Sequence, residues 1–382
     1  MISLDRLFFL GSYGILGILP LAQLKIAWQV LAPSDIGILF FVLALSMLIA
    51  SLCDANVNFR SITNTDSCSI EKEIREAFCL RITRFVLFMP FIILLSILVK
   101  FDIYILVSTL LIVMAKLLSV SYIYRNSGSV SLSVKWEIQL RGLTLMLPIL
   151  TLWLYGAKVG LLIGCFTVFL IQMILVLSFY GTKILPIKLI LNRSLDVNLV
   201  SAFIGVGYSN FSQVAAGLLL PSNTYAIFAS FDKLVRACLL IVEPTRLLVL
   251  REANIYKKNN TVNLTIYGLF LSVICFILIF ILFHSGLSKL IFETPLEQRF
   301  FILVASTTSF VSFITVCIFI QQGFVKLMSY GLAIGMLIGI ILFYFSMDND
   351  IYTAVVIFEL SVALSLLLTL FFIPNQVNRL KE

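Results

Sequence analysis

The chain has 382 residues, of which 61% are hydrophobic and 12% are charged, and its mean hydropathy is +1.10. A soluble domain is about 45–50% apolar and about 25% charged, so this composition excludes an ordinary soluble protein and indicates an integral membrane protein. The net charge of +8 is interpreted through its distribution along the chain, since basic loops set the orientation of membrane helices.

Apolar windows long enough to cross a bilayer as a helix, about 20 residues, recur along the whole chain. They lack the alternating pattern of membrane barrel strands. The first set is expected at residues 7–31, 36–56, 78–99, 103–124, 138–155 and 159–180. The second set is expected at residues 199–220, 225–250, 264–284, 300–321, 327–345 and 351–373. The sequence therefore predicts an all-α integral membrane protein with about twelve transmembrane helices.

The positions of lysine and arginine orient these helices, because cytoplasmic loops carry an excess of both. With the N-terminus inside, most of the 27 lysines and arginines fall on the cytoplasmic side. The opposite side keeps Lys100, Lys158, Lys289 and Arg299. Both termini are therefore expected in the cytoplasm. The orientation of the helices in the membrane accounts for the net positive charge, and no nucleic-acid partner is expected.

A short internal repeat divides the chain into halves. Residues 33–40 read Pro-Ser-Asp-Ile-Gly-Ile-Leu-Phe, and residues 221–228 read Pro-Ser-Asn-Thr-Tyr-Ala-Ile-Phe. Each copy lies in the predicted outward turn between the first two helices of its half. We therefore predict two six-helix bundles, residues 1–190 and 191–382, as parallel copies about an axis along the membrane normal.

The common signatures of enzymes are missing. The sequence has no phosphate-binding loop of the form G-x-x-x-x-G-K-[ST], and its single histidine, His284, lies at a helix end. No cluster of histidine, cysteine and carboxylate has metal-ligand spacing. The seven cysteines lie mostly within apolar runs, which argues against a disulfide framework. No catalytic residue, metal or cofactor is expected, and the protein is not expected to be an enzyme.

Residues 225–251 form an apolar segment that nevertheless contains several charges. On a helix, Asp232, Arg236 and Glu243 fall on one stripe, and Lys233 adds a cation. A charge at membrane depth costs about 2.5–3.5 kcal/mol, so such groups usually face protein or water. Two interpretations stay open. The stripe lines a path for a polar solute, or Asp232 and Arg236 neutralise each other within the packing.

Other charged residues are predicted within or at the ends of spans. Lys25 reaches either a cavity or the outer boundary, and Lys116 is expected in the middle of the fourth span, facing inward. Asp54 is either a helix cap or part of a cytoplasmic vestibule, and Glu359 either takes a proton or pairs with a lysine.

These residues form two candidate sets. A cationic cavity suits an anion, and arginine in particular suits phosphate. The predicted binding residues are Lys25, Lys116, Lys233 and Arg236. The candidate proton or ion carriers are Asp54, Asp232, Glu243 and Glu359.

Gly331, Gly335 and Gly339 form two successive G-x-x-x-G steps. Such steps allow close approach of two membrane helices, so packing is their expected role.

Four segments carry a resemblance to polysaccharide-export flippases. Residues 28–46 (WQVLAPSDIGILFFVLALS) and 52–63 (LCDANVNFRSIT) are similar to the opening of that family, with Ala55 in place of its usual glycine. Residues 121–141 look like its connection between helices four and five, without the usual tryptophan and glutamine. Residues 225–236 look like its eighth helix. The chain thus resembles the O-antigen flippase branch of the multidrug/oligosaccharidyl-lipid/polysaccharide exporter superfamily.

The resemblance implies two six-helix bundles around a central cationic cavity that works by alternating access in the bacterial inner membrane. The implied substrate is an undecaprenyl-diphosphate-linked oligosaccharide, moved from the cytoplasmic to the periplasmic leaflet. Lys25, Lys233 and Arg236 match places where the family tends to put cavity charges. Besides membrane lipid, a polysaccharide polymerase and a chain-length regulator are candidate partners. The rival interpretations are a multidrug exporter or peptidoglycan-precursor flippase of similar fold, and an O-antigen polymerase, which is an enzyme.

Overall fold

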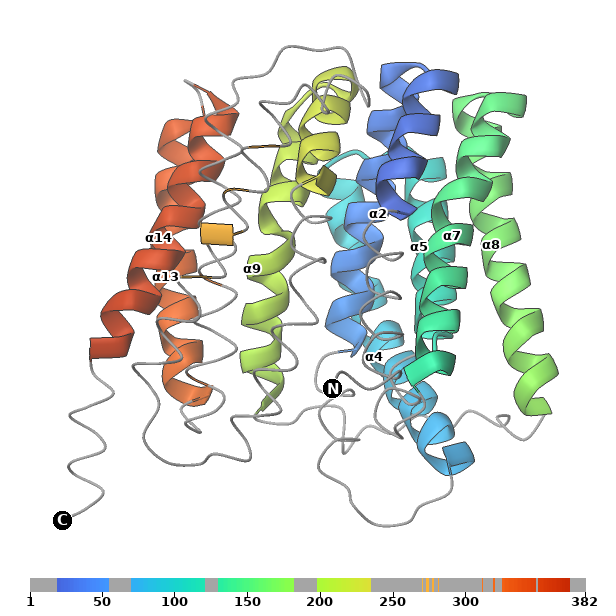
Figure 1. Cartoon of the computed structure of the whole chain (residues 1–382), viewed down its shortest axis with the longest axis horizontal. Coiled ribbons are helices and arrows are strands. Elements are labelled where there is room, and N and C mark those ends of the chain that lie inside the picture. Colours follow the sequence, from blue (N-terminus) through green and yellow to red (C-terminus); the bar gives the residue numbers. More distant parts are fainter. Residues whose placement is uncertain are drawn as a thin grey trace. The chain divides into compact units, whose positions relative to one another are not determined.

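The computed structural model of the chain describes residues 19–54, 70–120, 130–181, 198–234, 325–347 and 350–371, with a few isolated positions between 270 and 319. The regular structure of these residues is helical throughout (Figure 1). The chain forms two compact units. The N-terminal unit is Ala22–Ala229, and the C-terminal unit is Ser230–Glu382 with Met1–Leu21. The predicted division into residues 1–190 and 191–382 stays a prediction.

In the described part of the chain, eight helices have defined bounds. The N-terminal unit contains α2 (Pro33–Asp54), α4 (Ile70–Leu98), α5 (Ile103–Leu117), α7 (Val130–Tyr155), α8 (Ala157–Tyr180) and α9 (Asn198–Leu219). The C-terminal unit contains α13 (Val325–Ser346) and α14 (Ile351–Phe371). Residues 19–30 and 222–234 are also helical.

Among the described residues, six helices are long and apolar enough to cross a membrane, and α5 is a shorter apolar helix. Each of these helices overlaps one of the spans predicted from the sequence. This confirms an all-helical, multi-pass membrane protein. The predicted spans 264–284 and 300–321 lie outside the described residues apart from isolated positions, as do large parts of 7–31 and 225–250. The total of twelve spans and the orientation of the termini therefore stay predictions.

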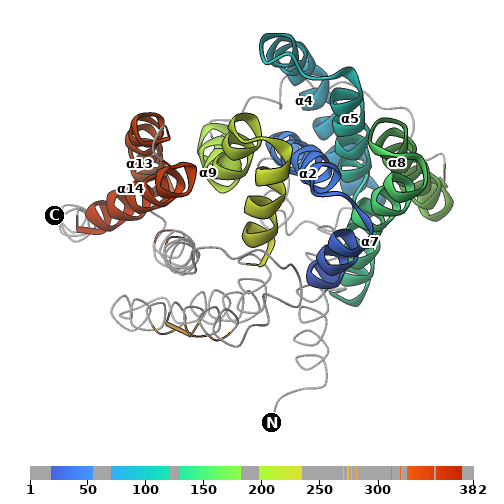
Figure 2. The same cartoon turned by 90° about the horizontal axis from the view of Figure 1, so that it is seen from above.

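The central helix of the N-terminal unit is α2, which packs against α4, α5 and α9. Figures 1 and 2 show it between α5 and α9, with α8 beside α5 and α7. A helix that is apolar on every face is stable only when it is surrounded, and the exposed large apolar residue of α2 is Met47. In contrast, α4 exposes Phe91, Leu94 and Leu98 by 54–70%. That apolar face suits contact with lipid.

The glycine steps of α13 confirm the predicted packing role, since they lie against α14. A Cβ atom added at Gly335 would lie 2.8 Å from the Cα of Val362, so the two backbones are nearly in contact. The Ser365 hydroxyl donates a hydrogen bond to the carbonyl oxygen of Gly331 at 2.8 Å. Small residues at this interface thus allow both van der Waals contact and an interhelical hydrogen bond.

Candidate functional site

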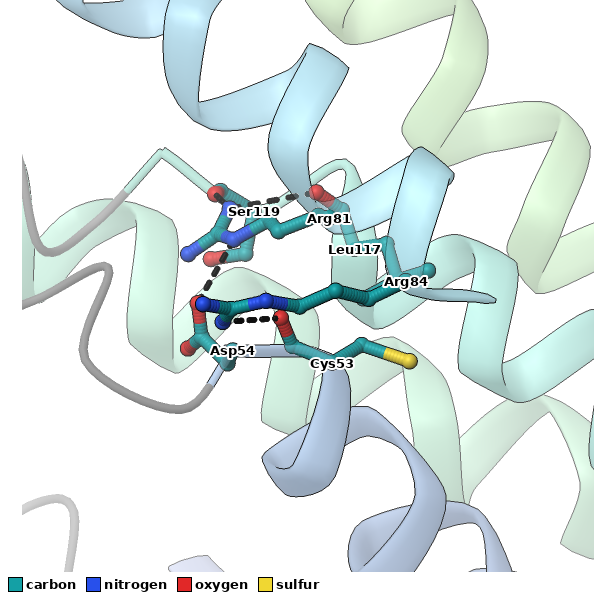
Figure 3. A network of polar contacts seen from close by, with 6 residues as sticks. All are labelled: Cys53, Asp54, Arg81, Arg84, Leu117 and Ser119. Carbon is teal, nitrogen blue, oxygen red and sulfur yellow. Dashed lines mark hydrogen bonds and ion pairs between the residues drawn. The ribbon is translucent and has the colours of Figure 1, made fainter. Parts of the chain in front are cut away.

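The ends of two helices, α2 and α5, meet around two buried arginines of α4. Arg81 and Arg84 lie one turn apart, and each is only 2% exposed. Figure 3 shows both guanidinium groups beside the last residues of α2 and of α5. We call Asp54, Arg81 and Arg84, with the backbone carbonyls that they contact, the arginine clamp.

Arg81 binds both neighbouring helix ends. Its Nε donates to Oδ1 of Asp54 at 2.6 Å, and its Nη1 donates to the carbonyl oxygens of Leu117 at 3.1 Å and Ser119 at 2.7 Å. The last carbonyls of a helix have no partner within it and carry the negative end of the helix dipole. Arg81 therefore caps α5 with a buried positive charge and joins it to the end of α2.

Arg84 makes the equivalent contact with α2. Its Nη1 donates to the carbonyl oxygen of Cys53 at 3.1 Å, one residue before the helix ends. Buried charges are tolerated only when they are paired and hydrogen-bonded. The two arginines therefore stabilise the fold by fixing the ends of two helices from a third.

The clamp also explains how α5 can end early. Its 15 residues rise about 22 Å, which is less than the hydrocarbon thickness of about 30 Å. Backbone groups at membrane depth must be satisfied by protein or by water in a cavity. Arg81 satisfies the carbonyls of Leu117 and Ser119 at this depth.

The end of α5 at Leu117 corrects one prediction from the sequence. The span was predicted to run to residue 124, with Lys116 in its middle, but Lys116 lies in the last turn of α5. Leu118 and Val120 continue the apolar run after the helix has ended. Hydropathy alone does not detect such an end. At this position the ammonium group also lies favourably near the negative end of the helix dipole.

Lys116 links α5 to α2. Its Nζ donates to the Ser46 hydroxyl at 3.0 Å and lies 3.6 Å from Sδ of Met47. The Ser46 hydroxyl itself donates to the carbonyl oxygen of Leu43 at 2.8 Å, so its lone pairs are directed to the ammonium group. Lys116 is half-buried, and Met47 is 47% exposed. The ammonium thus lies at the edge of the packed core, beside Met47, the exposed large apolar residue of α2.

The other predicted binding residues are not brought into one site by the described residues. Lys25 is exposed in the N-terminal unit, and Lys233 is half-buried in the C-terminal unit. Arg236 lies outside the described residues, so the four-cation cavity stays a prediction.

The candidate carriers fall in different surroundings. Asp54 is paired with Arg81, and Glu359 is 5% exposed in α14. Asp232 is half-buried, and Glu243 lies outside the described residues. The ion pair supports a structural role for Asp54, and a role in ion coupling stays a prediction for all four.

Sequence reasoning missed the clamp because Arg81 and Arg84 were counted only as basic residues of the cytoplasmic side. Their spacing of three residues, just inside an apolar stretch, places them on one face of a helix that continues into the membrane. That spacing is the signal that could have identified them.

The chain is similar in structure to a multidrug resistance MATE family transporter of the MOP superfamily, solved in its inward-facing conformation. The TM-score is 0.50 at 13% sequence identity, over 98% of this chain and 96% of that chain. A mutant of the Vibrio cholerae MATE transporter VcmN is also similar, with a TM-score of 0.49 and 10% identity over 98% and 96% of the two chains. No protein-family model and no curated protein sequence matches the chain. The first likeness shows that the chain has a fold similar to that of this MATE family transporter.

Proposed function

We propose that the protein is a membrane exporter that flips an undecaprenyl-diphosphate-linked oligosaccharide from the cytoplasmic to the periplasmic leaflet of a bacterial inner membrane. The fold supports the exporter class, and the sequence resemblance supports the substrate class. The observation that contributes most from this chain is Lys116, a half-buried cation held between Ser46 and the exposed Met47 of α2.

The surroundings of Lys116 suit binding of a phosphate group. An ammonium group has three N–H donors, and a thioether such as that of Met47 is a weak acceptor. A phosphate oxygen can replace the thioether at little cost, because charge-assisted hydrogen bonds are about twice as strong as neutral ones. Ser46 would keep the ammonium in place during this exchange. The oligosaccharide would then occupy the predicted central cavity between the two bundles, while the polyprenyl chain stays in lipid.

A multidrug exporter is the second candidate. A cationic drug needs a carboxylate in the cavity, and the buried Glu359 of α14 is the described residue that favours this alternative. Lys116 opposes it, because an ammonium group that binds substrate, as proposed here, would repel a cationic drug.

Charge removal at Lys116 tests the proposal. We expect Lys116→Met to reduce transport by about ten- to a hundredfold, since a hydrogen bond between charged groups contributes about 1.5–3 kcal/mol. Lys116→Arg keeps the positive charge and should retain a substantial part of the transport activity. The measurement is the amount of surface polysaccharide in cells that lack the native gene and express each variant, normalised to the level of the protein.

Lys158→Met is the matched control. Lys158 Nζ lies 5.8 Å from the ring centre of Tyr104, near the start of α5 rather than its end. This variant should transport normally. Normal surface polysaccharide with Lys116→Met, at a normal protein level, would rule out Lys116 as a binding residue.

A further inference from the structure

A cavity of about 320 Å³ lies at the other end of α5, where residues 99–102 connect α4 to α5. This volume is near the lower limit for small-ligand sites, which are about 300–1,000 Å³. Its lining residues come from α2, the α4–α5 turn, α9 and the helix 222–234. They include Gly37, Phe41, Lys100, Asp102, Gly217 and Tyr225.

Lys100 has an unusual backbone conformation in this turn. Its φ angle is 56°, in the left-handed region. Its N–H donates to the carbonyl of Ile97 at 3.2 Å, and the N–H of Phe101 donates to the carbonyl of Ser96 at 2.9 Å. These two bonds form a Schellman motif, which usually has glycine at the position of Lys100. The sequence thus has a lysine where glycine would be more stable, and such strained residues concentrate at ligand sites.

Asp102 provides the opposite charge at the same cavity. It is the N-cap residue of α5, yet its side chain makes no capping hydrogen bond. An aspartate at this position usually accepts a hydrogen bond from the first amides of the helix. Asp102 instead lines the cavity without this capping bond. The cavity therefore has one ammonium and one carboxylate, two residues apart in the sequence.

The surroundings place the cavity at a boundary between lipid and water. The turn connects two apolar helices, so it lies where the chain emerges from the bilayer. Next to it, Leu98, Ile103 and Leu218 are 70%, 77% and 38% exposed. These apolar side chains suit contact with acyl chains, while the charges of the cavity lie at the level of the head groups.

We propose that this cavity binds the head group of a zwitterionic phospholipid that has a primary ammonium. Lys100 would donate to the phosphate, and Asp102 would accept from the ammonium of the same head group. An anionic head group would leave Asp102 uncompensated, and a quaternary ammonium has no N–H to donate. This inference does not depend on which solute the protein transports.

Native mass spectrometry of the purified full-length protein tests the inference. The protein is titrated with phosphatidylethanolamine, phosphatidylcholine and phosphatidylglycerol of identical acyl chains. We expect phosphatidylethanolamine to bind about tenfold more tightly than the other two, as one additional charge-assisted hydrogen bond would give. Lys100→Gly should weaken the binding of all three lipids about tenfold, because their phosphate groups lose the same donor, while the thermal unfolding temperature stays equal or rises, since glycine adopts the left-handed conformation without strain.

Two further variants make the test specific. Asp102→Asn should remove the preference over phosphatidylcholine, whereas Lys158→Ala, which changes a cation outside the cavity lining, should keep it. Equal binding of the three lipids, or an unchanged affinity for phosphatidylethanolamine in Lys100→Gly, would overturn the inference. Displacement of the bound lipid by inorganic phosphate would overturn it too, since free phosphate would then be the ligand.

Discussion

Arg81→Met is expected to destabilise the folded protein by about 1.5–3 kcal/mol, the contribution of a hydrogen bond to a charged group, because the buried guanidinium is lost while the remaining Asp54 side chain is 30% exposed to water. The substitution leaves the Asp54 carboxylate without its guanidinium and the carbonyls of Leu117 and Ser119 without their donor. Methionine nearly fills the same volume, so lost packing contributes little. The measurement is thermal unfolding of the purified protein in detergent, together with the amount of folded protein recovered from membranes.

Two variants serve as comparisons. Arg141 pairs with Glu137 at 2.6 Å on one face of α7, and its side chain is 34% exposed. Arg141→Met should therefore cost only about 0.3–0.5 kcal/mol, as for other such pairs on helix surfaces. Asp54→Asn keeps an acceptor for Arg81 and should cost less than Arg81→Met. Equal losses for Arg81→Met and Arg141→Met would contradict the clamp.

Gly37→Ala, at the one glycine of α2, is expected to destabilise the folded protein. An added Cβ would lie 1.9 Å from the carbonyl oxygen of Ser222 and 2.7 Å from its carbonyl carbon, so one backbone must move. Overpacking of this kind costs about 1–3 kcal/mol or more. Thermal unfolding and recovery of folded protein measure the loss.

Gly142→Ala provides the matched control, because no atom lies within 4 Å of the Cβ that it adds to α7. The same chemical change there should stabilise the protein by about 0.4–1 kcal/mol, through the lower entropy of the unfolded chain. The two substitutions should thus have opposite signs. Stabilisation by both would show that α2 and residue 222 do not approach as closely as described.

The contact at Gly37 joins the two copies of the internal repeat. Proline stands at the start of both helices, since α2 begins at Pro33 and the helix 222–234 follows Pro221. The sequence predicted that the copies correspond and that each starts a helix. It did not predict that Gly37 lies against Ser222, or that the rings of Phe41 and Tyr225 meet edge to face at 6.1 Å. Such a contact between distant segments depends on the complete fold.

Hydropathy predicted the helices well, because insertion into a bilayer depends on segment length and polarity, which a single segment contains. Hydropathy failed to predict two features, the early end of α5 and the burial of a charged residue of α4. The run around Leu118 is apolar beyond the end of α5, and Arg81 is charged yet buried. Both features depend on partners from other helices, so they could not be read from one segment.

Reconstitution tests the proposed function most directly. Purified protein is placed in liposomes that contain a fluorescent undecaprenyl-diphosphate oligosaccharide, and an impermeant quencher reports how much of it changes leaflet without ATP. We predict transfer well above that of protein-free liposomes, reduced about ten- to a hundredfold by Lys116→Met and unaffected by Lys158→Met. Transport of a cationic drug by the same liposomes, while the oligosaccharide lipid stays in its original leaflet, would contradict the proposal.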